Sequence, residues 1–564
     1  MKNKIFLLAI IALFFAGCED FLDRKPLGQE TVESFLGNPE TAEASFEQMI
    51  RACYSTFYAS ENSIGQHNHH GEWMFGDWLS DDCEKGGDGA ADFPEVLDWR
   101  RWDITPTTAN HENNAWRVAY AGIGRANSVL NLLEQYQAAL SPETYDRIKG
   151  EALFIRGYYF FYLAKVYGSV PYFDAPILAD QYYDQQRLAP EALYAEIEAD
   201  LTEAASLLLP IGQWEDVWPG GRATKGSAQA VLARVISMEI GFDFNEKEWE
   251  DVYAVTSEII ASNEYSLLAN YAMIFEFEGE QSSESVFEIQ CADLGQTYGA
   301  PGGNIQCRMT TYRTPADQSD RRLTANGWGF STPSENLVAE FEAGDPRLPC
   351  TAISDGDRLN EDGDPLTNEV IDVDETDQCP TGYWFRKYTI HQDTSITNNT
   401  AGEKNMRLIR YAEVLLLHAE ACYWTSRESE ALEMVNMVRD RARQSTYPKG
   451  SEEGNPDYPD PSDDPNLLPP ISSSGTQLLE DIKHERRVEL AIEGQRTWDL
   501  IRWGEYEDAL VNRIIPDDHF LSGEDANEIL LNYQSHLYDE KVPSFPIPPN
   551  EASVYRIQQS PGYN

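Results

Sequence analysis

Aromatic side chains are concentrated in two long stretches, residues 58–114 and 279–348, that show neither helical nor strand periodicity. A flat aromatic ring can stack on the apolar C–H face of a sugar, whose hydroxyl groups need carboxylates, amides and guanidinium groups nearby. The chemistry that these residue types suit is therefore non-covalent capture of a carbohydrate. The aromatic candidates are Trp73, Trp78, Trp99, Trp102, Tyr298, Tyr312 and Trp328, and the polar candidates are Asp81, Asp82, Asn304 and Arg313.

Trp328 stands out among the aromatic candidates because Gly327 and Gly329 flank it, and their missing side chains would let a ligand approach the ring. For any single tryptophan the alternative is that the ring only fills the core. The predicted ligand-binding residues are Trp78, Asp82, Trp102, Tyr298, Arg313 and Trp328.

No catalytic residue is predicted. A glycoside hydrolase needs two carboxylates at a fixed separation, and with 95 acidic residues in the chain, candidate pairs carry no information. A surface-bound glycoside hydrolase nevertheless stays an alternative function.

Metal binding is suggested at two places, and we predict no metal ligand at either. His67, His69 and His70 could bind zinc, but no second ligand cluster follows at a fixed spacing, so a polar loop is the better interpretation. Residues 358–369 partly match a calcium loop, although Arg358 occupies the first ligand position. Structural calcium is the only cofactor kept as an alternative.

Residues 485–505, ERRVELAIEGQRTWDLIRWGE, combine a dense set of charges with an apolar stripe that includes Val488, Ile492 and Trp498. The spacing predicts one continuous helix. Arg486–Glu489, Glu493–Arg496, Arg496–Asp499 and Asp499–Arg502 are all three residues apart, the distance of intrahelical ion pairs. We interpret this segment as architecture and not as a reactive site.

The N-terminus and the overall charge limit where the chain can work. Lys2 and Lys4 precede an apolar run that ends in Ala16-Gly17-Cys18, the pattern of a bacterial lipoprotein signal in which Cys18 is acylated. An ordinary secretory signal with a chance cysteine is the alternative. A net charge of -52 disfavours binding to nucleic acid.

Seven cysteines remain after Cys18, which leaves at least one unpaired. A disulfide between Cys291 and Cys307, or between Cys350 and Cys379, would close a short loop. Cys422 lies on a helical apolar stripe and is predicted to be a buried thiol.

Helical stripes recur along the chain with steps of three and four residues. They predict helices around 119–133, 148–166, 197–208, 228–238, 248–263 and 408–424, and one through 431–442. The last two form a helix pair of the tetratricopeptide kind, with a turn at 426–429, although no strict repeat period is visible. The fold class predicted is mostly α.

Several motifs along the chain resemble those of the SusD/RagB family of surface lipoproteins. They are CEDFLDRKPLG (18–28), RLIRYAEVLLLHAEA (407–421), VNMVRDRAR (435–443), IKHERRVELAIEGQRTWDLIRWG (482–504), FPIPPNE (545–551) and QQSPGY (558–563). In that family the segment around 485–496 is a scaffold signature, and the tryptophan of a loop-then-helix element like residues 327–347 commonly lies near the ligand.

The resemblance implies an irregular scaffold of tetratricopeptide-like helix pairs supporting a loop-rich ligand-binding region. It divides the chain into a signal peptide (1–17), a lipidated tether (18–35), an N-terminal helical part (36–260) and a C-terminal part (261–564) packed as one unit with it. It also implies a non-enzymatic, glycan-binding lipoprotein on the outside of the outer membrane, with a SusC-like TonB-dependent transporter as partner. A peptide ligand, or a scaffold for protein partners, is the alternative.

Overall fold

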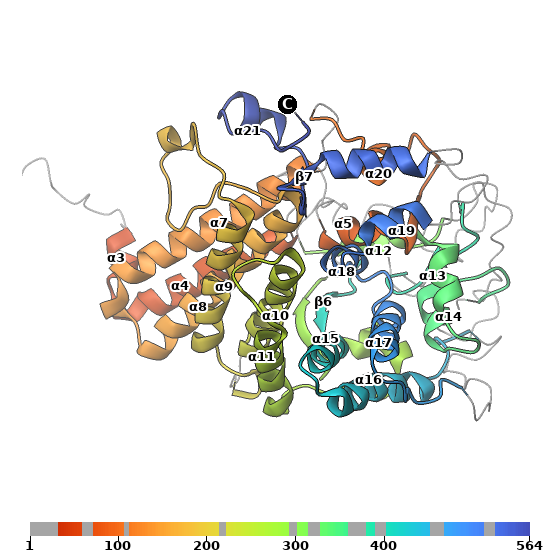
Figure 1. Ribbon diagram of the computed structural model, residues 1–564. Helices are drawn as coiled ribbons and strands as arrows, with labels where there is room; N and C mark the ends of the chain where they lie inside the picture. Colours follow the sequence, from red (N-terminus) through yellow and green to blue (C-terminus); the bar gives the residue numbers. More distant parts are fainter. Residues whose placement is uncertain are drawn as a thin grey trace, which may run out of the picture.

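The computed structural model describes residues 32–58, 71–106, 112–213, 221–292, 302–313, 327–358, 379–389, 402–451, 467–512 and 525–563. These residues are mainly helical, as the sequence predicts (Figure 1). The α-helices are α3 (Val32–Leu36), α4 (Pro39–Tyr54), α5 (Glu72–Trp78), α6 (Glu95–Arg101), α7 (Glu112–Gln135), α8 (Pro142–Tyr167), α9 (Pro190–Leu207), α10 (Lys225–Phe242), α11 (Trp249–Ser262), α12 (Ile305–Thr310), α13 (Glu335–Glu340), α14 (Arg347–Thr351), α15 (Tyr411–Trp424), α16 (Glu428–Arg443), α17 (Thr476–Glu489), α18 (Arg496–Trp503), α19 (Tyr506–Asn512), α20 (Ala526–Ser535) and α21 (Pro549–Ser553).

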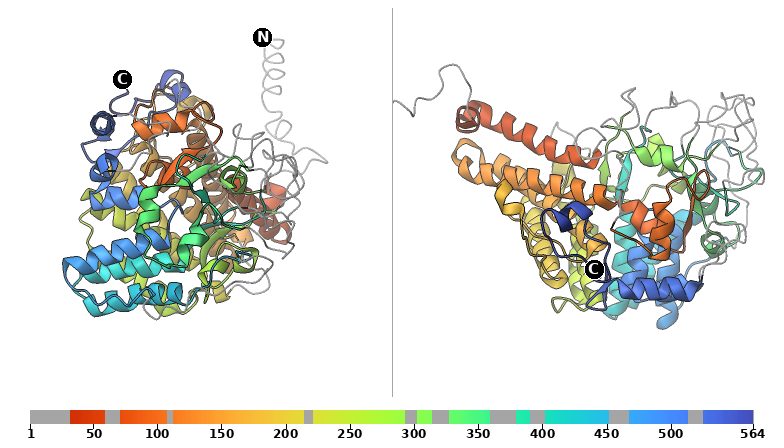
Figure 2. Two further views of the ribbon diagram at one scale, coloured as in Figure 1. Left: turned by 90° about the vertical axis from the view of Figure 1, so that its right-hand side faces the viewer. Right: turned by 90° about the horizontal axis from the view of Figure 1, so that it is seen from above.

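Helices α7 to α11 pack in chain order, each against the next. Figure 2 shows α4 lying alongside α7 at one end of this row. Helix α8 contacts both α7 and α9, so almost every side chain from Ile148 to Tyr167 is buried. Ser141 caps its N-terminus by accepting the Thr144 N–H at 3.3 Å, and Pro142 occupies the first turn. The predicted stripes of the first half are thus confirmed as helix faces.

The second half of the chain builds on this row through α15 and α18, which pack against α11 and α10 respectively (Figure 1). Helices α15 and α16 form the predicted antiparallel pair, and α17 packs against both. The helix predicted over 408–424 begins only at Tyr411, because Leu408 to Arg410 belong to a strand. The turn of the pair ends earlier than predicted, since α16 starts at Glu428.

The described strands form four antiparallel two-stranded ladders. They are β1 (Cys83–Gly86) with β3 (Phe330–Pro333), β2 (Ser285–Ile289) with β6 (Met406–Arg410), β4 (Ala352–Ile353) with β5 (Trp384–Phe385), and β7 (Leu537–Tyr538) with β8 (Val542–Pro543). Two of these ladders join segments more than 100 residues apart, and so fix loops that local helix formation could not hold.

The single helix predicted over 485–505 is wrong. Helix α17 ends at Glu489 and α18 begins at Arg496, because the intervening chain turns through positive φ values at Ile492 (53°) and Gly494 (79°). Of the four predicted ion pairs only Asp499–Arg502 forms, at 2.9 Å.

The other charges of this segment pair with distant elements, so its architectural role stands. Arg486 reaches Asp499 at 2.7 Å, and Arg496 reaches Asp81 at 2.8 Å. Glu493 accepts from Arg410 at 2.7 Å. The charges that sequence spacing assigned to one helix surface instead join α17 and α18 to the rest of the molecule.

All seven cysteines in the described residues are free thiols, so neither of the two pairs considered from the sequence forms a disulfide. Cys422 is fully buried, as predicted. Within the same residues, no helix combines the length and the apolar character needed to cross a membrane.

Candidate ligand-binding site

The β1–β3 ladder carries the loop that contains Trp328. Gly86 pairs with Phe330, and the Gly87 N–H extends the ladder by donating to the Gly329 carbonyl at 2.9 Å. On the other side, the Trp328 N–H donates to the Arg308 carbonyl of α12 at 3.0 Å. The tryptophan backbone is therefore held between a strand and a helix, which fixes where its ring can point.

Of the predicted binding residues that the structure describes, Trp328 and Arg313 keep partly exposed side chains. The Trp328 ring meets Phe330 edge to face, with centroids 6.5 Å apart. Arg313 is 26% exposed and forms ion pairs with Asp88 at 3.0 Å and with Asp92 at 3.7 Å. A Cβ on Gly329, the residue after Trp328, would lie 3.3 Å from the Arg313 Cβ, so Arg313 and its two carboxylate partners belong to the same region as the tryptophan. These group types can stack on a sugar and bond its hydroxyls.

The glycines beside Trp328 serve a different purpose from the one predicted. A Cβ on Gly327 would lie 1.9 Å from the Thr311 carbonyl oxygen, and a Cβ on Gly329 would lie 2.5 Å from the Trp384 ring. Gly329 also has φ +70°, a conformation that other residues rarely adopt. The two glycines let the loop pack closely against Thr311 and Trp384. Their missing side chains do not serve to open the Trp328 ring to a ligand.

Trp78 and Trp102, which were predicted to contact ligand, have side chains 0% and 2% exposed. The Trp78 indole N–H donates to Ser331 Oγ at 2.7 Å, and Trp102 stacks on Phe545 with centroids 5.4 Å apart. Their rings are enclosed on both faces, so in this arrangement neither can stack on a bound sugar. Trp78 supports the loop through Ser331 and Phe330, whereas Trp102 packs between Tyr533 and Phe545 of the C-terminal segment.

Asp82 is also buried, and its charge is used within the protein. Asp81 and Asp82 face Arg487 and Arg496, with Asp82 2.8 Å from Arg487 and Asp81 2.8 Å from Arg496. Burial opposes ionisation of both carboxyls and the two arginines favour it; the balance lowers the pKa of Asp81 and raises that of Asp82, which also feels the neighbouring Asp81 charge. These ion pairs attach the loop below β1 to α17 and α18.

The remaining candidates divide between the core and residues outside the described ranges. Trp99 and Asn304 are 0% exposed and Tyr312 is 5% exposed, whereas Trp73 is partly buried against Trp78. Tyr298, the histidines at 67, 69 and 70, the acidic part of the calcium-like loop and Cys18 lie outside the described residues.

Lys85, Asp88 and Asp92 were not recognised from the sequence, although all three lie in the loop next to the candidate site. The Lys85 Nζ donates to the Gly89 carbonyl at 3.0 Å and lies over the Phe330 ring, 5.5 Å from its centroid. Burial lowers the pKa of Lys85 to about 8. The alternation of glycine with charge in EKGGDGAAD was the available signal, because such loops turn tightly and present carboxylates.

A separate groove of about 560 Å³ lies between α7, residues 171–185 and the C-terminal segment. Its wall includes Trp116, Tyr120, Phe173 and Tyr555, and none of the predicted binding residues. This groove is the alternative location for an extended ligand.

Two family models match the chain and together span most of it. The model of the SusD family matches residues 283–563, and a model described as "Starch-binding associating with outer membrane" matches residues 20–236.

Curated relatives and solved structures agree with these matches. A SusD-like protein from Bacteroides ovatus is 24% identical, over 90% of this chain and 83% of its own. SusD-like protein P25 from Formosa agariphila is 25% identical, over 89% of this chain and 90% of its own. The structure of surface glycan-binding protein A from Bacteroides thetaiotaomicron in complex with laminarihexaose has a TM-score of 0.69 at 21% identity, covering 92% of this chain and 99% of that one. At this identity the structural likeness establishes the fold.

Proposed function

The chain belongs to the SusD/RagB family, and from that premise we propose that it is a cell-surface glycan-binding lipoprotein that passes oligo- or polysaccharide to a SusC-like TonB-dependent transporter. The description of the matched N-terminal model, starch binding in association with the outer membrane, supports this proposal. So does the laminarihexaose bound to a protein of the same fold.

The observation that carries the proposal is the partly exposed Trp328 side chain on a loop whose backbone is hydrogen-bonded at both sides. Arg313 lies beside this loop, since a Cβ on Gly329 would be 3.3 Å from the Arg313 Cβ. In this proposal Trp328 stacks on a sugar ring, while Arg313 and the carboxylates of Asp88 and Asp92 bond its hydroxyls. A rigid loop favours binding because little conformational freedom is lost when the ligand arrives.

The other predicted residues take supporting roles. Trp78 packs beneath the loop, Trp102 packs against Phe545, and Asp82 attaches the segment before β1 to Arg487. Tyr298 stays in the proposal as a ligand contact. No step of bond breaking is assigned to any residue, since capture needs only stacking and hydrogen bonds.

Trp328→Ala should weaken binding of the cognate glycan by about thirtyfold or more, because an aromatic anchor contributes roughly 2 kcal/mol or more and each 1.4 kcal/mol is tenfold. Isothermal titration calorimetry against a panel of oligosaccharides that includes laminarihexaose measures this. Trp424→Ala is the matched control, since Trp424 is 51% exposed on a distant helix and should leave the affinity unchanged.

Each alternative has its own outcome in the same experiment. Equal affinity in the wild type and Trp328→Ala, with a loss in Tyr555→Ala, would move the site to the groove beside α7. Steady release of shortened sugars would overturn the non-enzymatic assignment. Binding of a folded protein or a peptide, with no glycan bound across the panel, would favour the other ligand classes.

A further inference from the structure

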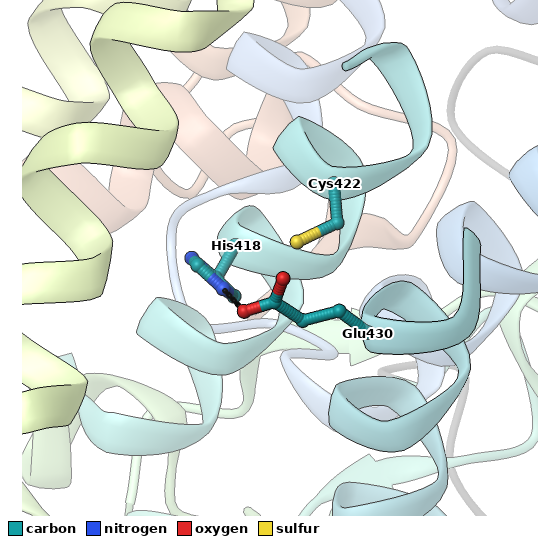
Figure 3. A group of neighbouring side chains, drawn as sticks. All are labelled: His418, Cys422 and Glu430. Carbon is teal, nitrogen blue, oxygen red and sulfur yellow. Dashed lines mark hydrogen bonds and ion pairs between the residues drawn. The ribbon is translucent and has the colours of Figure 1, made fainter. Parts of the chain in front are cut away.

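His418, Cys422 and Glu430 converge where α15 meets α16, away from the loop that carries Trp328 (Figure 3). His418 and Cys422 lie one helical turn apart on the same face of α15, and Glu430 comes from the first turn of α16. One ligand atom from each side chain lies within 4.8 Å of the other two. His418 and Cys422 are 2% and 0% exposed, whereas the Glu430 side chain is 38% exposed.

Two contacts position the His418 ring. The Thr256 hydroxyl of α11 lies 2.8 Å from His418 Nδ1, and it also lies 2.8 Å from the Val252 carbonyl. On the other side of the ring, Nε2 lies 3.2 Å from Oε1 of Glu430, the contact drawn in Figure 3. The imidazole is therefore held with Nε2 directed at the Glu430 carboxylate.

A metal ion between Nε2 and the carboxylate would replace this contact and bind both groups. Cys422 adds a third donor atom at the same point. As a thiolate, cysteine is a strong ligand for a metal.

The surroundings orient two of the three donors, as is usual in protein metal sites. Thr256 fixes the His418 ring, and Tyr253 stacks on that ring with centroids 5.0 Å apart while its hydroxyl donates to Oε2 of Glu430 at 3.3 Å. Arg427 brings a positive charge nearby, but its guanidinium is paired with Glu250 at 2.8 Å and 2.9 Å.

We propose that His418 Nε2, Cys422 Sγ and a Glu430 carboxylate oxygen bind a zinc ion that joins α15 to α16. Nitrogen, sulfur and oxygen donors together suit Zn²⁺, which prefers four ligands in a tetrahedron. Bond lengths of about 2.0–2.3 Å set the donors roughly 3.5 Å apart, so the three donor atoms, now within 4.8 Å of one another, need to close in by about 1 Å at most. Water from the exposed side supplies the fourth ligand.

Binding breaks the Cys422 S–H bond and forms a Zn–S bond, and the proton goes to solvent. Zinc stays divalent and no electron is transferred. A free thiol is mainly protonated at neutral pH, so about one proton should be released for each metal bound.

The test uses the full chain, reduced and without a histidine tag, titrated with Zn²⁺ and with Co²⁺ as a spectroscopic substitute. We expect one metal ion per chain and a thiolate-to-cobalt charge-transfer absorption. Cys422→Ser should abolish that absorption, whereas Cys53→Ser, which changes another buried thiol, should retain it. Thr256→Val should weaken zinc binding by about 10–100-fold, since it removes only the group that orients His418.

A triple change of His67, His69 and His70 to alanine separates this site from the histidine-rich segment. Survival of the cobalt absorption in that variant supports the proposal, and its loss overturns it. Failure of the wild-type chain to bind one equivalent of either metal, or an unchanged absorption in folded Cys422→Ser, also overturns it. Circular dichroism of each variant shows that the fold is intact.

Discussion

At the scale of single residues, Glu489 shows how charges in the segment around 485–505 hold distant elements together through buried ion pairs. Its buried carboxylate accepts hydrogen bonds from Arg347 at 3.2 Å, from Arg410 at 3.0 Å and from Arg441. Burial opposes ionisation, but the three arginines outweigh it and lower the pKa of Glu489 to about 2. One side chain of α17 thereby fixes α14, β6 and α16.

Glu489→Gln should destabilise the protein by about 3–5 kcal/mol at neutral pH, because it leaves buried arginine charge uncompensated. The ionised carboxylate of the wild type stabilises the fold above its ordinary pKa of 4.5, and this contribution is lost as the pH falls from 4.5 towards 2. The difference in the free energy of unfolding between Glu489→Gln and the wild type should therefore become smaller as the pH falls over that range. Urea unfolding at pH 7 and pH 3 measures it.

Glu480→Gln is the matched control on the same helix, since the Glu480 side chain is 63% exposed and lies 3.8 Å from Lys483. A surface pair of this kind is worth about 0–1 kcal/mol. Equal losses in the two variants would contradict the role assigned to Glu489.

Residue type alone could not distinguish the buried tryptophans from the partly exposed one. Trp78, Trp102 and Trp328 all lie in aperiodic stretches, and what distinguishes them is contact with distant parts of the chain. Trp102 donates to the Tyr506 hydroxyl, 404 residues away, and Trp78 to Ser331, 253 residues away. No spacing rule contains these contacts, so burial of the first two rings could not be predicted.

At the scale of elements, prediction succeeded wherever the signal was local. The stripes of α7 to α11 follow from steps of three and four residues, and those helices formed as expected. The break between α17 and α18 was missed because Ile492 adopts φ 53°, a conformation that an isoleucine accepts only when tertiary contacts favour it. Most charges at 485–502 likewise form their ion pairs with residues of other elements.

Gly329→Ala should destabilise the protein and disturb the loop that carries Trp328. The change adds strain at φ +70° and a methyl group 2.5 Å from Trp384, so we expect a loss of about 2–4 kcal/mol from strain and overpacking together. Glycan affinity should fall several-fold because the Trp328 backbone shifts with it. Urea unfolding and calorimetric titration measure the two effects.

Gly504→Ala provides the matched control for this change. Gly504 has φ +71°, almost the same as Gly329, but a Cβ there would meet nothing within 4 Å. Only the backbone strain of about 1–2 kcal/mol should appear, and glycan affinity should stay the same. If the two alanine variants lose equal stability, the close approach of Gly329 to Trp384 is not important.

At the scale of the whole molecule, the net charge bears on how the chain could be attached to a membrane. A net charge of -52 repels an anionic lipid surface, so electrostatics do not favour attachment to a membrane, and in our proposal the lipid on Cys18 supplies it. Cys18→Ala should therefore move the chain from the membrane fraction to the soluble fraction, while Cys291→Ala leaves it in place. Mass spectrometry of the N-terminal peptide should show the acyl chains on Cys18; sedimentation unchanged by Cys18→Ala, with no lipid mass, would refute the anchor.

The transporter partnership also belongs to this scale, since a protein that only captures glycan needs a second protein to move it across the membrane. Solubilisation in a mild detergent should recover the chain together with a TonB-dependent barrel. Trp328→Ala should be recovered with the barrel as well as the wild type is, because the ligand loop and the partner surface are separate in this proposal. Recovery of the wild-type chain alone, from cells that express the barrel, would contradict the partnership, and loss of the barrel only in Trp328→Ala would place that loop in the contact with the transporter.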